Sequence, residues 1–247
     1  MKAAEETVRL RRQVLQQSYY LAALPHLEAV PAWGALSGVR PTKLSTKYLL
    51  AGGTVAGAKA LLRDVYYVTE PRIELALDCS KSTVNAAGKL APNHISLYVG
   101  IPFCRTRCTY CSFAATDLKH GSKWTEPYVQ AVIREMQLVK DELARYDMRG
   151  LYIGGGTPTA LSCDQLARVI DAALEYFPCA KEFTVEAGRP DTIDENMLRM
   201  MRARGVSRVS LNPQTMCDET LQRVGRGHTA EDIRRVYAMM RDMGFDC

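Results

Sequence analysis

The sequence predicts an α/β fold in which a parallel sheet of four β/α units follows a smaller, mainly helical N-terminal region. From residue 95 onward, apolar runs typical of buried strands alternate with amphipathic helical segments, which implies right-handed βαβ units. Every unusual motif follows one of these strands, and parallel sheets bind their ligands at the carboxyl ends of strands. With 47% apolar and 24% charged residues, the 247-residue chain has an ordinary composition for a globular protein with a sizeable core.

Residues 1–90 are interpreted as an accessory region. Apolar periodicity predicts helices at 7–30 and 47–65, and the segment GVRPTKLS between them is turn-forming around Pro41. Small and turn-forming residues at 82–93 predict a linker to the second part of the chain.

Residues 91–247 are expected to form the main domain. The predicted strands are 95–101, 150–156, 182–187 and 208–212. The predicted helices are 125–146, 161–177, 194–204, 218–225 and 229–244. Ser162 with Gln165 forms a capping-box pattern, Thr229 can cap the last helix, and Gly205 and Gly244 are placed to end helices. A fifth strand would begin at the last residues, GFDC, so we expect the chain to be a piece of a longer protein.

Charge and targeting signals narrow the class of protein. The net charge of +5 suits an anionic substrate but is too weak and dispersed to indicate nucleic-acid binding. The N-terminal residues have no secretory pattern, and no apolar run is long enough for a membrane span. We therefore expect a cytoplasmic protein, in which eight cysteines are better explained as ligands and buried thiols than as disulfides.

Three cysteines follow the first predicted strand. Cys104, Cys108 and Cys111 have C-x3-C-x2-C spacing, and three thiolates can bind three irons of a 4Fe–4S cluster. The fourth iron would then stay open to a ligand from outside the protein. One alternative is a zinc site completed by His120, although structural zinc usually takes four paired ligands; another is a set of unligated thiols. The cysteines without ligand-like spacing are Cys79, Cys163, Cys179, Cys217 and Cys247.

The segment CRTRCTYC resembles the signature of the radical S-adenosylmethionine (SAM) superfamily, C-x3-C-x-aromatic-C, with Tyr110 as the aromatic residue. The resemblance implies a (β/α)6-type barrel, of which about four β/α units are visible here. It also implies a 4Fe–4S cluster whose open iron is chelated by the amino and carboxylate groups of SAM. In that superfamily an electron from the cluster cleaves SAM, and the resulting 5′-deoxyadenosyl radical takes a hydrogen from the substrate.

The motifs after the next strands resemble SAM-binding segments of oxygen-independent coproporphyrinogen III oxidases (coproporphyrinogen dehydrogenases). GGGTP implies that Gly155, Gly156 and Thr157 bind the methionyl amino group, although a glycine-rich strand end can also be a plain turn. Glu186, at the end of an apolar strand, is then a SAM contact rather than a solvated rim residue. Arg189 lies one residue closer to this glutamate than the arginine of the family's E-x-D-P-R pattern.

Three further residues complete the predicted site. Gln214 and Arg226 have the separation of two SAM-contacting residues of the same family, and an arginine fork suits a carboxylate. Arg226 could instead be a cation at a helix C-terminus, and His228 a turn residue or a proton shuttle. Tyr98, six residues before Cys104, matches a SAM-contacting tyrosine.

The resemblance implies an enzyme that oxidatively decarboxylates coproporphyrinogen III to protoporphyrinogen IX in heme biosynthesis. Its partners would be the porphyrinogen and an electron-donor protein such as flavodoxin or ferredoxin. Two departures stand out: Ser112 and Phe113 follow the third cysteine where the oxidases have Gly-Cys, and Gly100 stands where they have His. Heme chaperones share the Phe, so a heme-binding or heme-delivery protein is the alternative function.

Overall fold

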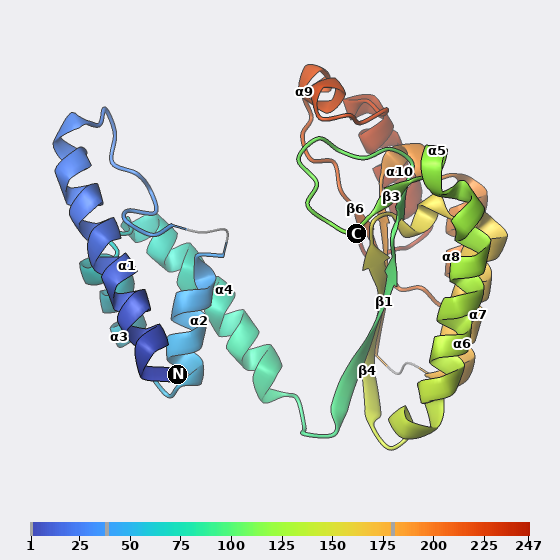
Figure 1. Ribbon diagram of the computed structural model, residues 1–247, viewed down its shortest axis with the longest axis horizontal. Helices are drawn as coiled ribbons and strands as arrows, with labels where there is room; N and C mark the ends of the chain where they lie inside the picture. Colours follow the sequence, from blue (N-terminus) through green and yellow to red (C-terminus); the bar gives the residue numbers. More distant parts are fainter. Residues whose placement is uncertain (1, 38–39, 179–180) are drawn as a thin grey trace. The chain divides into compact units, whose positions relative to one another are not determined.

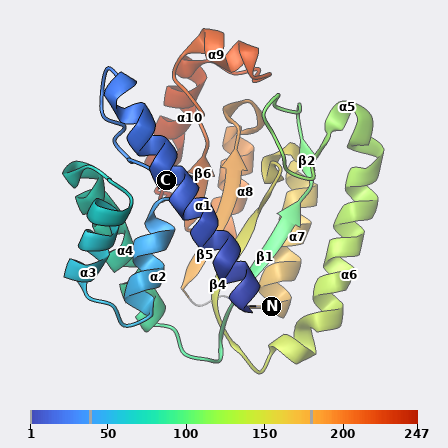
Figure 2. The same cartoon turned by 60° about the vertical axis from the view of Figure 1, so that its left-hand side comes forward.

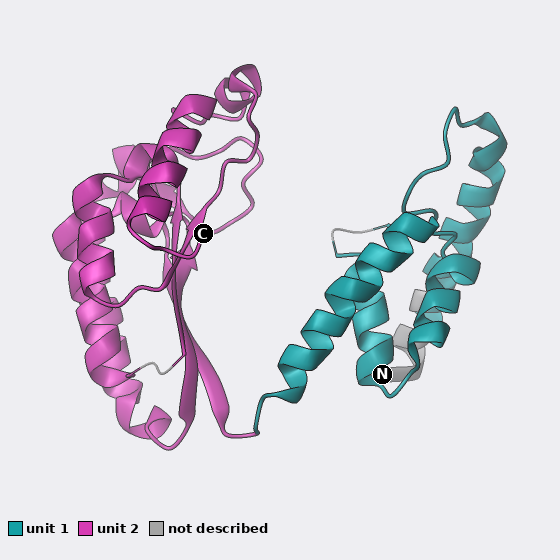
Figure 3. Ribbon diagram, turned by 180° about the vertical axis from the view of Figure 1, so that it is seen from behind, with its two compact units in different colours: residues 1–91 teal, residues 92–247 magenta. Residues whose placement is uncertain are grey.

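The computed structural model describes residues 2–37, 40–178 and 181–247, and these form two compact units, 1–91 and 92–247 (Figure 3). Two expectations fall partly outside the described residues: the start of the GVRPTKLS segment, at residues 38–39, and Cys179. No helix within the described ranges is long and apolar enough to cross a membrane.

The first unit is helical. Its elements are α1 (Lys2–Ala23), η1 (Leu24–His26), α2 (Thr42–Leu50), α3 (Val55–Ala60), the π-helical turn η2 (Leu61–Val65) and α4 (Glu70–Gly88). A small core formed by Ala58, Leu62, Ile73 and Leu77, with other side chains, holds α3, η2 and α4 together.

Two predictions for this unit were wrong. The helix expected at 47–65 is broken at Gly52, whose φ of 88° is left-handed, and Thr54 then caps α3 by accepting a hydrogen bond from Gly57 N (3.0 Å). The linker expected at 82–93 is helical as far as Gly88. Threonine disfavours helix interiors when its hydroxyl competes for backbone groups. In α4 the Thr83 hydroxyl donates to Cys79 O (2.9 Å), so its hydrogen bond is made within the helix.

The second unit is a parallel α/β layer structure, which confirms the predicted fold class. A four-stranded sheet has the order β1 (His94–Ile101), β4 (Asp147–Gly155), β5 (Glu182–Gly188) and β6 (Arg208–Leu211), seen side by side in Figure 2. The connecting helices α6 (Thr125–Leu143), α7 (Cys163–Tyr176) and α8 (Glu195–Ala203) lie along one face of the sheet (Figure 1).

The remaining elements are short or follow the sheet. They are β2 (Phe103–Cys104), β3 (Thr116–Asp117), α5 (Leu118–Gly121), η3 (Ser122–Trp124), η4 (Pro158–Ala160), η5 (Pro190–Thr192), α9 (Asp218–Arg223) and α10 (Ala230–Asp242). Beyond α10, Asp246 pairs in parallel with Arg208 of β6, at the position where a fifth strand was expected.

Strand and helix side chains form one apolar core in this unit. Ile153 and Val185 from the sheet and Leu166 and Leu198 from the helices have no exposed surface. Each strand and the helix that follows it contribute side chains to this core. The strands therefore keep a fixed register, and their carboxyl ends lie at one edge of the sheet.

The capping box of α7 is present as predicted. Ser162 Oγ accepts from Gln165 N, and Gln165 Oε1 accepts from Ser162 N, each at 3.2 Å. We expect Ser162→Ala to lower the free energy of unfolding by about 1 kcal/mol, as measured by denaturant titration. Ser162→Asp keeps an acceptor and should retain most of the stability, so equal losses in both variants would contradict the role of the cap.

Candidate functional site

The three cysteines lie on a loop at the carboxyl end of β1, here called the cysteine loop (residues 104–111). Its base is closed by the pairing of Phe103 in β2 with Thr116 in β3 and by a hydrogen bond from Thr116 N to Pro102 O (2.8 Å). Figure 1 shows this segment beyond the end of β1, next to the segment that carries α9. The loop therefore occupies the ligand-binding edge expected for a parallel sheet.

The thiols of Cys104, Cys108 and Cys111 are free and partly buried. Cys104 Sγ accepts a hydrogen bond from Thr157 Oγ1 (3.4 Å). Burial raises the pKa of Cys104, while this hydrogen bond and the charge of Arg189 act in the opposite direction. A bound metal would favour the thiolate at such a site much more strongly.

The predicted alternative of a zinc site finds no support here. Among the residues that the structure describes, no three or more His, Cys, Asp or Glu side chains are grouped to hold one metal ion. His120 is instead paired with Asp117 through Nδ1 and Oδ1 (2.8 Å). A cluster takes each cysteine at a different iron, so its cysteines do not need to converge on one point.

The environments of the thiols predict an order of reactivity in the protein without metal. Cys217 is exposed, and hydrogen bonds from the side chain and backbone of Thr220 lower its pKa, whereas burial raises that of Cys104. Iodoacetamide should therefore label Cys217 first and Cys104 more slowly near neutral pH, because the thiolate is the nucleophile. Raising the pH should reduce the difference between the labelling rates of Cys217 and Cys104, because a larger fraction of Cys104 is then ionised. Peptide mapping at two pH values checks this; equal rates at neutral pH would contradict it.

Gly155, Gly156 and Thr157 lie against the base of the cysteine loop. Gly156 N donates to Ile101 O and Thr157 N to Phe103 O, both at 2.8 Å. A Cβ on Gly156 would lie 2.7 Å from Phe103 O and 3.0 Å from Cys104 Sγ, so only glycine fits. Gly155 also has a left-handed φ of 108°. The glycines therefore do more than form a turn, because they allow the strand end and the loop to touch.

Glu186 at the end of β5 is partly buried and held at both carboxylate oxygens. Asn212 Nδ2 donates to Oε1 (3.0 Å) and Tyr152 OH donates to Oε2 (3.4 Å). The ring of Tyr152 stacks on Tyr98 with centroids 5.6 Å apart, which links the predicted Tyr98 to Glu186. Tyr98 itself is 60% exposed. Tyr152, within β4, and Asn212, directly after β6, were not predicted from the sequence; their closeness in the sequence to Gly155 and Gln214 was the available signal.

Arg226 also joins this group. Its Nη1 donates to Asn212 O (3.1 Å) and its Nη2 to Tyr110 OH (3.4 Å), so its guanidinium is directed to the site rather than to the last turn of α9. Within the described residues its buried Nε has no hydrogen-bond partner. Gln214 is exposed and has a left-handed φ of 66°, which is uncommon for a residue with a side chain. In the described part of the chain, Gln214 makes no side-chain hydrogen bond to the other predicted residues.

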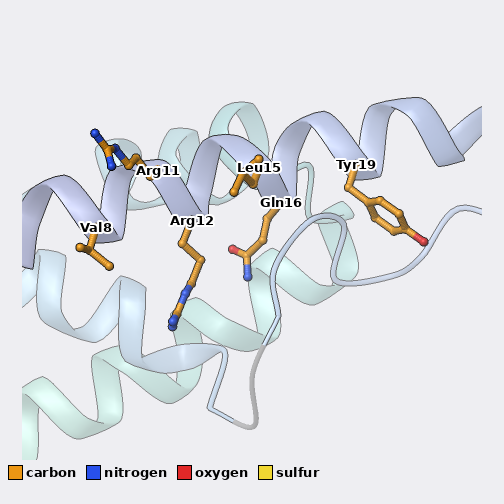
Figure 4. Close-up of a pocket in the computed structure, with 6 residues that line it drawn as sticks. All are labelled: Val8, Arg11, Arg12, Leu15, Gln16 and Tyr19. Atoms are coloured by element: carbon orange, nitrogen blue, oxygen red, sulfur yellow. The ribbon is translucent and has the colours of Figure 1, made fainter.

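A cavity of about 300 Å³ adjoins the cysteine loop and the glycines. Its lining includes Tyr98, Pro102, Phe113, Tyr128 and Gly155. An open groove of about 560 Å³ on α1, lined by Val8, Arg11, Arg12, Leu15, Gln16 and Tyr19, contains none of the predicted site residues (Figure 4).

Comparison with known proteins identifies the family. Residues 98–247 match the radical SAM superfamily. The chain belongs to this superfamily. The cofactors of a radical SAM protein, a 4Fe–4S cluster and SAM, are therefore those of this chain. The residues present fit them: three free thiols on one loop, a glycine cradle that a Cβ would fill, and a buried Arg226 Nε that has no hydrogen-bond partner among the described residues.

Individual proteins with assigned names are similar to parts of this chain. The chain is 34% identical over 228 residues to the oxygen-independent coproporphyrinogen-III oxidase-like protein HemZ of Bacillus subtilis, covering 90% of this chain and 46% of HemZ. It is 34% identical over 154 residues to the heme chaperone HemW of the same organism, covering 61% of this chain and 40% of HemW. The structure of coproporphyrinogen III oxidase (HemN) from Escherichia coli matches with a TM-score of 0.58 and 28% identity, over 67% of this chain and 38% of HemN.

These similarities bear on the predicted architecture. The likeness to HemN supports the prediction that the second unit is part of a radical SAM barrel. The chain spans less than half the length of the curated relatives that it matches.

Proposed function

We propose that this chain is part of a radical SAM oxidoreductase that converts coproporphyrinogen III to protoporphyrinogen IX without oxygen. The observation that carries the proposal is the contact between the cysteine loop and the Gly155–Thr157 segment, in which the thiol of Cys104 lies against Gly156 and Thr157 at the sheet edge. The similarity to the oxidase-like HemZ over 90% of the chain supports the choice of substrate.

Each predicted residue receives a role in this proposal. The cluster ligands are Cys104, Cys108 and Cys111, which leave one iron for SAM. SAM would be held by Tyr98, Gly155, Gly156, Thr157, Glu186, Gln214 and Arg226. The cluster and SAM together supply the one-electron chemistry that removes a hydrogen atom from an unreactive carbon.

The protein's own contribution is to orient the reactants. Tyr152 and Asn212 fix both oxygens of Glu186, which leaves the carboxylate one orientation toward a ligand. The buried Nε of Arg226 could donate a hydrogen bond to the carboxylate of SAM. The aromatic walls of the 300 Å³ cavity, Tyr98, Phe113 and Tyr128, would restrict water near the reacting carbon.

The substrate chemistry requires little more than positioning. A propionate side chain that loses one hydrogen atom from its β-carbon, one electron and CO2 becomes a vinyl group, and two propionates react. Holding that carbon beside the abstracting radical is the main task of the site. The exposed cations Arg105 and Arg107 on the cysteine loop suit a polyanionic substrate. Flavodoxin or ferredoxin would supply the electron that reduces the cluster, and a one-electron acceptor from outside the chain would take the electron that the substrate loses.

The test uses the full-length protein, reconstituted anaerobically with iron and sulfide and reduced. We expect 5′-deoxyadenosine to form on addition of SAM, faster when coproporphyrinogen III is present, with a product that has lost two carboxyl groups by mass. A Cys104→Ala protein is the blank. Substrate-independent cleavage without a decarboxylated product would refute the assigned substrate.

A second candidate function is heme binding or heme delivery on the same scaffold. Phe113, two residues after the third cysteine, is the residue that resembles heme chaperones, and it is 63% exposed at the rim of the cavity. The similarity to HemW supports this candidate. Titration of the same protein with heme, with and without the cluster, separates the two: tight heme binding with no decarboxylation favours delivery.

A further inference from the structure

Arg189, which follows β5, is the largest of the fully buried side chains in the described residues, with 2% of its surface exposed. Burying a guanidinium is costly unless it is paired and hydrogen-bonded. Its Nε and Nη2 donate to the two carboxylate oxygens of Asp191, at 3.0 and 3.1 Å. Burial alone would raise the pKa of Asp191, but the hydrogen bonds and charge of Arg189 hold it below its ordinary value, so the pair is charged at neutral pH.

The third nitrogen of Arg189 reaches the cysteine loop. Nη1 donates to Thr106 O (3.1 Å) and to Thr106 Oγ1 (2.8 Å). Thr106 lies midway between Cys104 and Cys108. Arg105 adds a hydrogen bond to Asp191 O and an ion pair with Asp191 Oδ2 (3.8 Å). One buried ion pair therefore holds the loop at Arg105 and at Thr106.

The same pair reaches a second segment, residues 224–228. Thr106 Oγ1 donates to Gly225 O (2.9 Å), and Thr109 N donates to Val224 O (3.2 Å). The fully buried side chain of His228 lies with Nδ1 3.5 Å from Asp191 Oδ1. Arg226, between these contacts, is thereby placed beside the loop.

We propose that Arg189 and Asp191 form a clamp that sets the cysteine loop and the 224–228 segment in register before any cofactor binds. The proposal rests on the proposed roles of the three cysteines and of Arg226, and it assigns Arg189 and Asp191 as positioning residues. A buried, bidentate pair suits this task. The planar guanidinium can bind both oxygens of a carboxylate and a further acceptor at fixed angles, and the single ammonium nitrogen of lysine cannot reproduce this geometry. Ordering the loop then costs less entropy when iron arrives.

The first test needs no cofactor. Thr106→Val removes the hydroxyl that accepts from Arg189 and donates to Gly225, whereas Thr106→Ser keeps it. In the full-length protein without metal, trypsin should cut after Arg105 and Arg107 roughly tenfold faster in Thr106→Val, and at the wild-type rate in Thr106→Ser. Cleavage after Arg199 in α8 serves as the internal reference for general unfolding. Equal cleavage rates at the loop in all three proteins would overturn the clamp. So would an equal increase in the rate of cleavage after Arg199 in Thr106→Val, because the variant would then be unfolding as a whole.

The second test replaces the arginine. In Arg189→Lys the loop should be cut faster than in the wild type, because a single ammonium nitrogen cannot reproduce the fork to both oxygens of Asp191 together with the contacts to Thr106. Arg204, directly after α8, is the control: its Nε and Nη2 make a similar fork to Asp171 of α7, at 2.7 and 3.1 Å. Arg204→Lys should leave cleavage at the loop unchanged. Wild-type cutting in Arg189→Lys would contradict the proposal.

A third measurement separates failure of the clamp from failure of the cluster assignment. After reconstitution, Thr106→Val should release iron to a chelator roughly tenfold faster than the wild type or Thr106→Ser. A variant with all three loop cysteines replaced by alanine should bind no cluster. If that variant keeps its iron, the cluster assignment is wrong, while the trypsin result still decides the clamp. If it loses its iron but Thr106→Val releases iron at the wild-type rate, the clamp proposal is refuted.

Discussion

Replacing Cys104, Cys108 or Cys111 with alanine is expected to remove nearly all the iron that the protein retains after anaerobic reconstitution. A 4Fe–4S cluster that is already held by only three thiolates has no spare ligand, so iron should fall from about four per chain to below about one. The measurement is iron and sulfide per chain, together with the visible absorption of the cluster.

Cys163→Ala is the matched control for these variants, because Cys163 is also free and partly buried but begins α7. It should keep the full cluster. Retention of iron in two or more of the loop variants would show that the cysteine loop does not bind the cluster.

Gly156→Ala is expected to disrupt the site from the segment after β4 that contacts the cysteine loop. The added Cβ would lie 2.7 Å from Phe103 O and 3.0 Å from Cys104 Sγ, and the backbone oxygen cannot move without opening the β2–β3 pairing. Overpacking of this kind costs about 1–3 kcal/mol, measured as the free energy of unfolding, and the displaced thiol should also lower iron retention.

Gly150→Ala, at the other end of β4, is the control for this crowding. There a Cβ would meet Ser96 Oγ at 3.4 Å, an ordinary contact, so stability and iron retention should change little. Equal losses in both variants would mean that Gly156 has no special part in holding Cys104.

The parts of the fold that could be predicted from the sequence have local causes. The capping box at Ser162 and the left-handed glycines Gly205 and Gly244 act within one helical turn, and each is present as expected. The apolar residues of the four strands could also be predicted, because the side chains that face the covering helices pack in the apolar core.

The parts that could not be predicted depend on which strands become neighbours. Tyr152 meets Glu186 only because β4 and β5 pair in one particular register. Arg189 lies one residue from the position that the family pattern suggests. Gly188 turns the backbone with a φ of 70°, and the next residue is buried. No local signal in the sequence distinguishes that arginine from a surface one.

The hydrogen bond between Thr106 and Gly225 joins residues 119 positions apart, and the one between Arg105 and Asp191 joins residues 86 apart. The entropy lost in closing such long loops opposes these contacts, so they become stable only after the intervening elements have formed. During synthesis the thiols of the loop would leave the ribosome well before the residues that enclose them. In that interval they would be open to oxidation, and we expect the loop to reach its cluster-binding geometry only once these long-range contacts have formed.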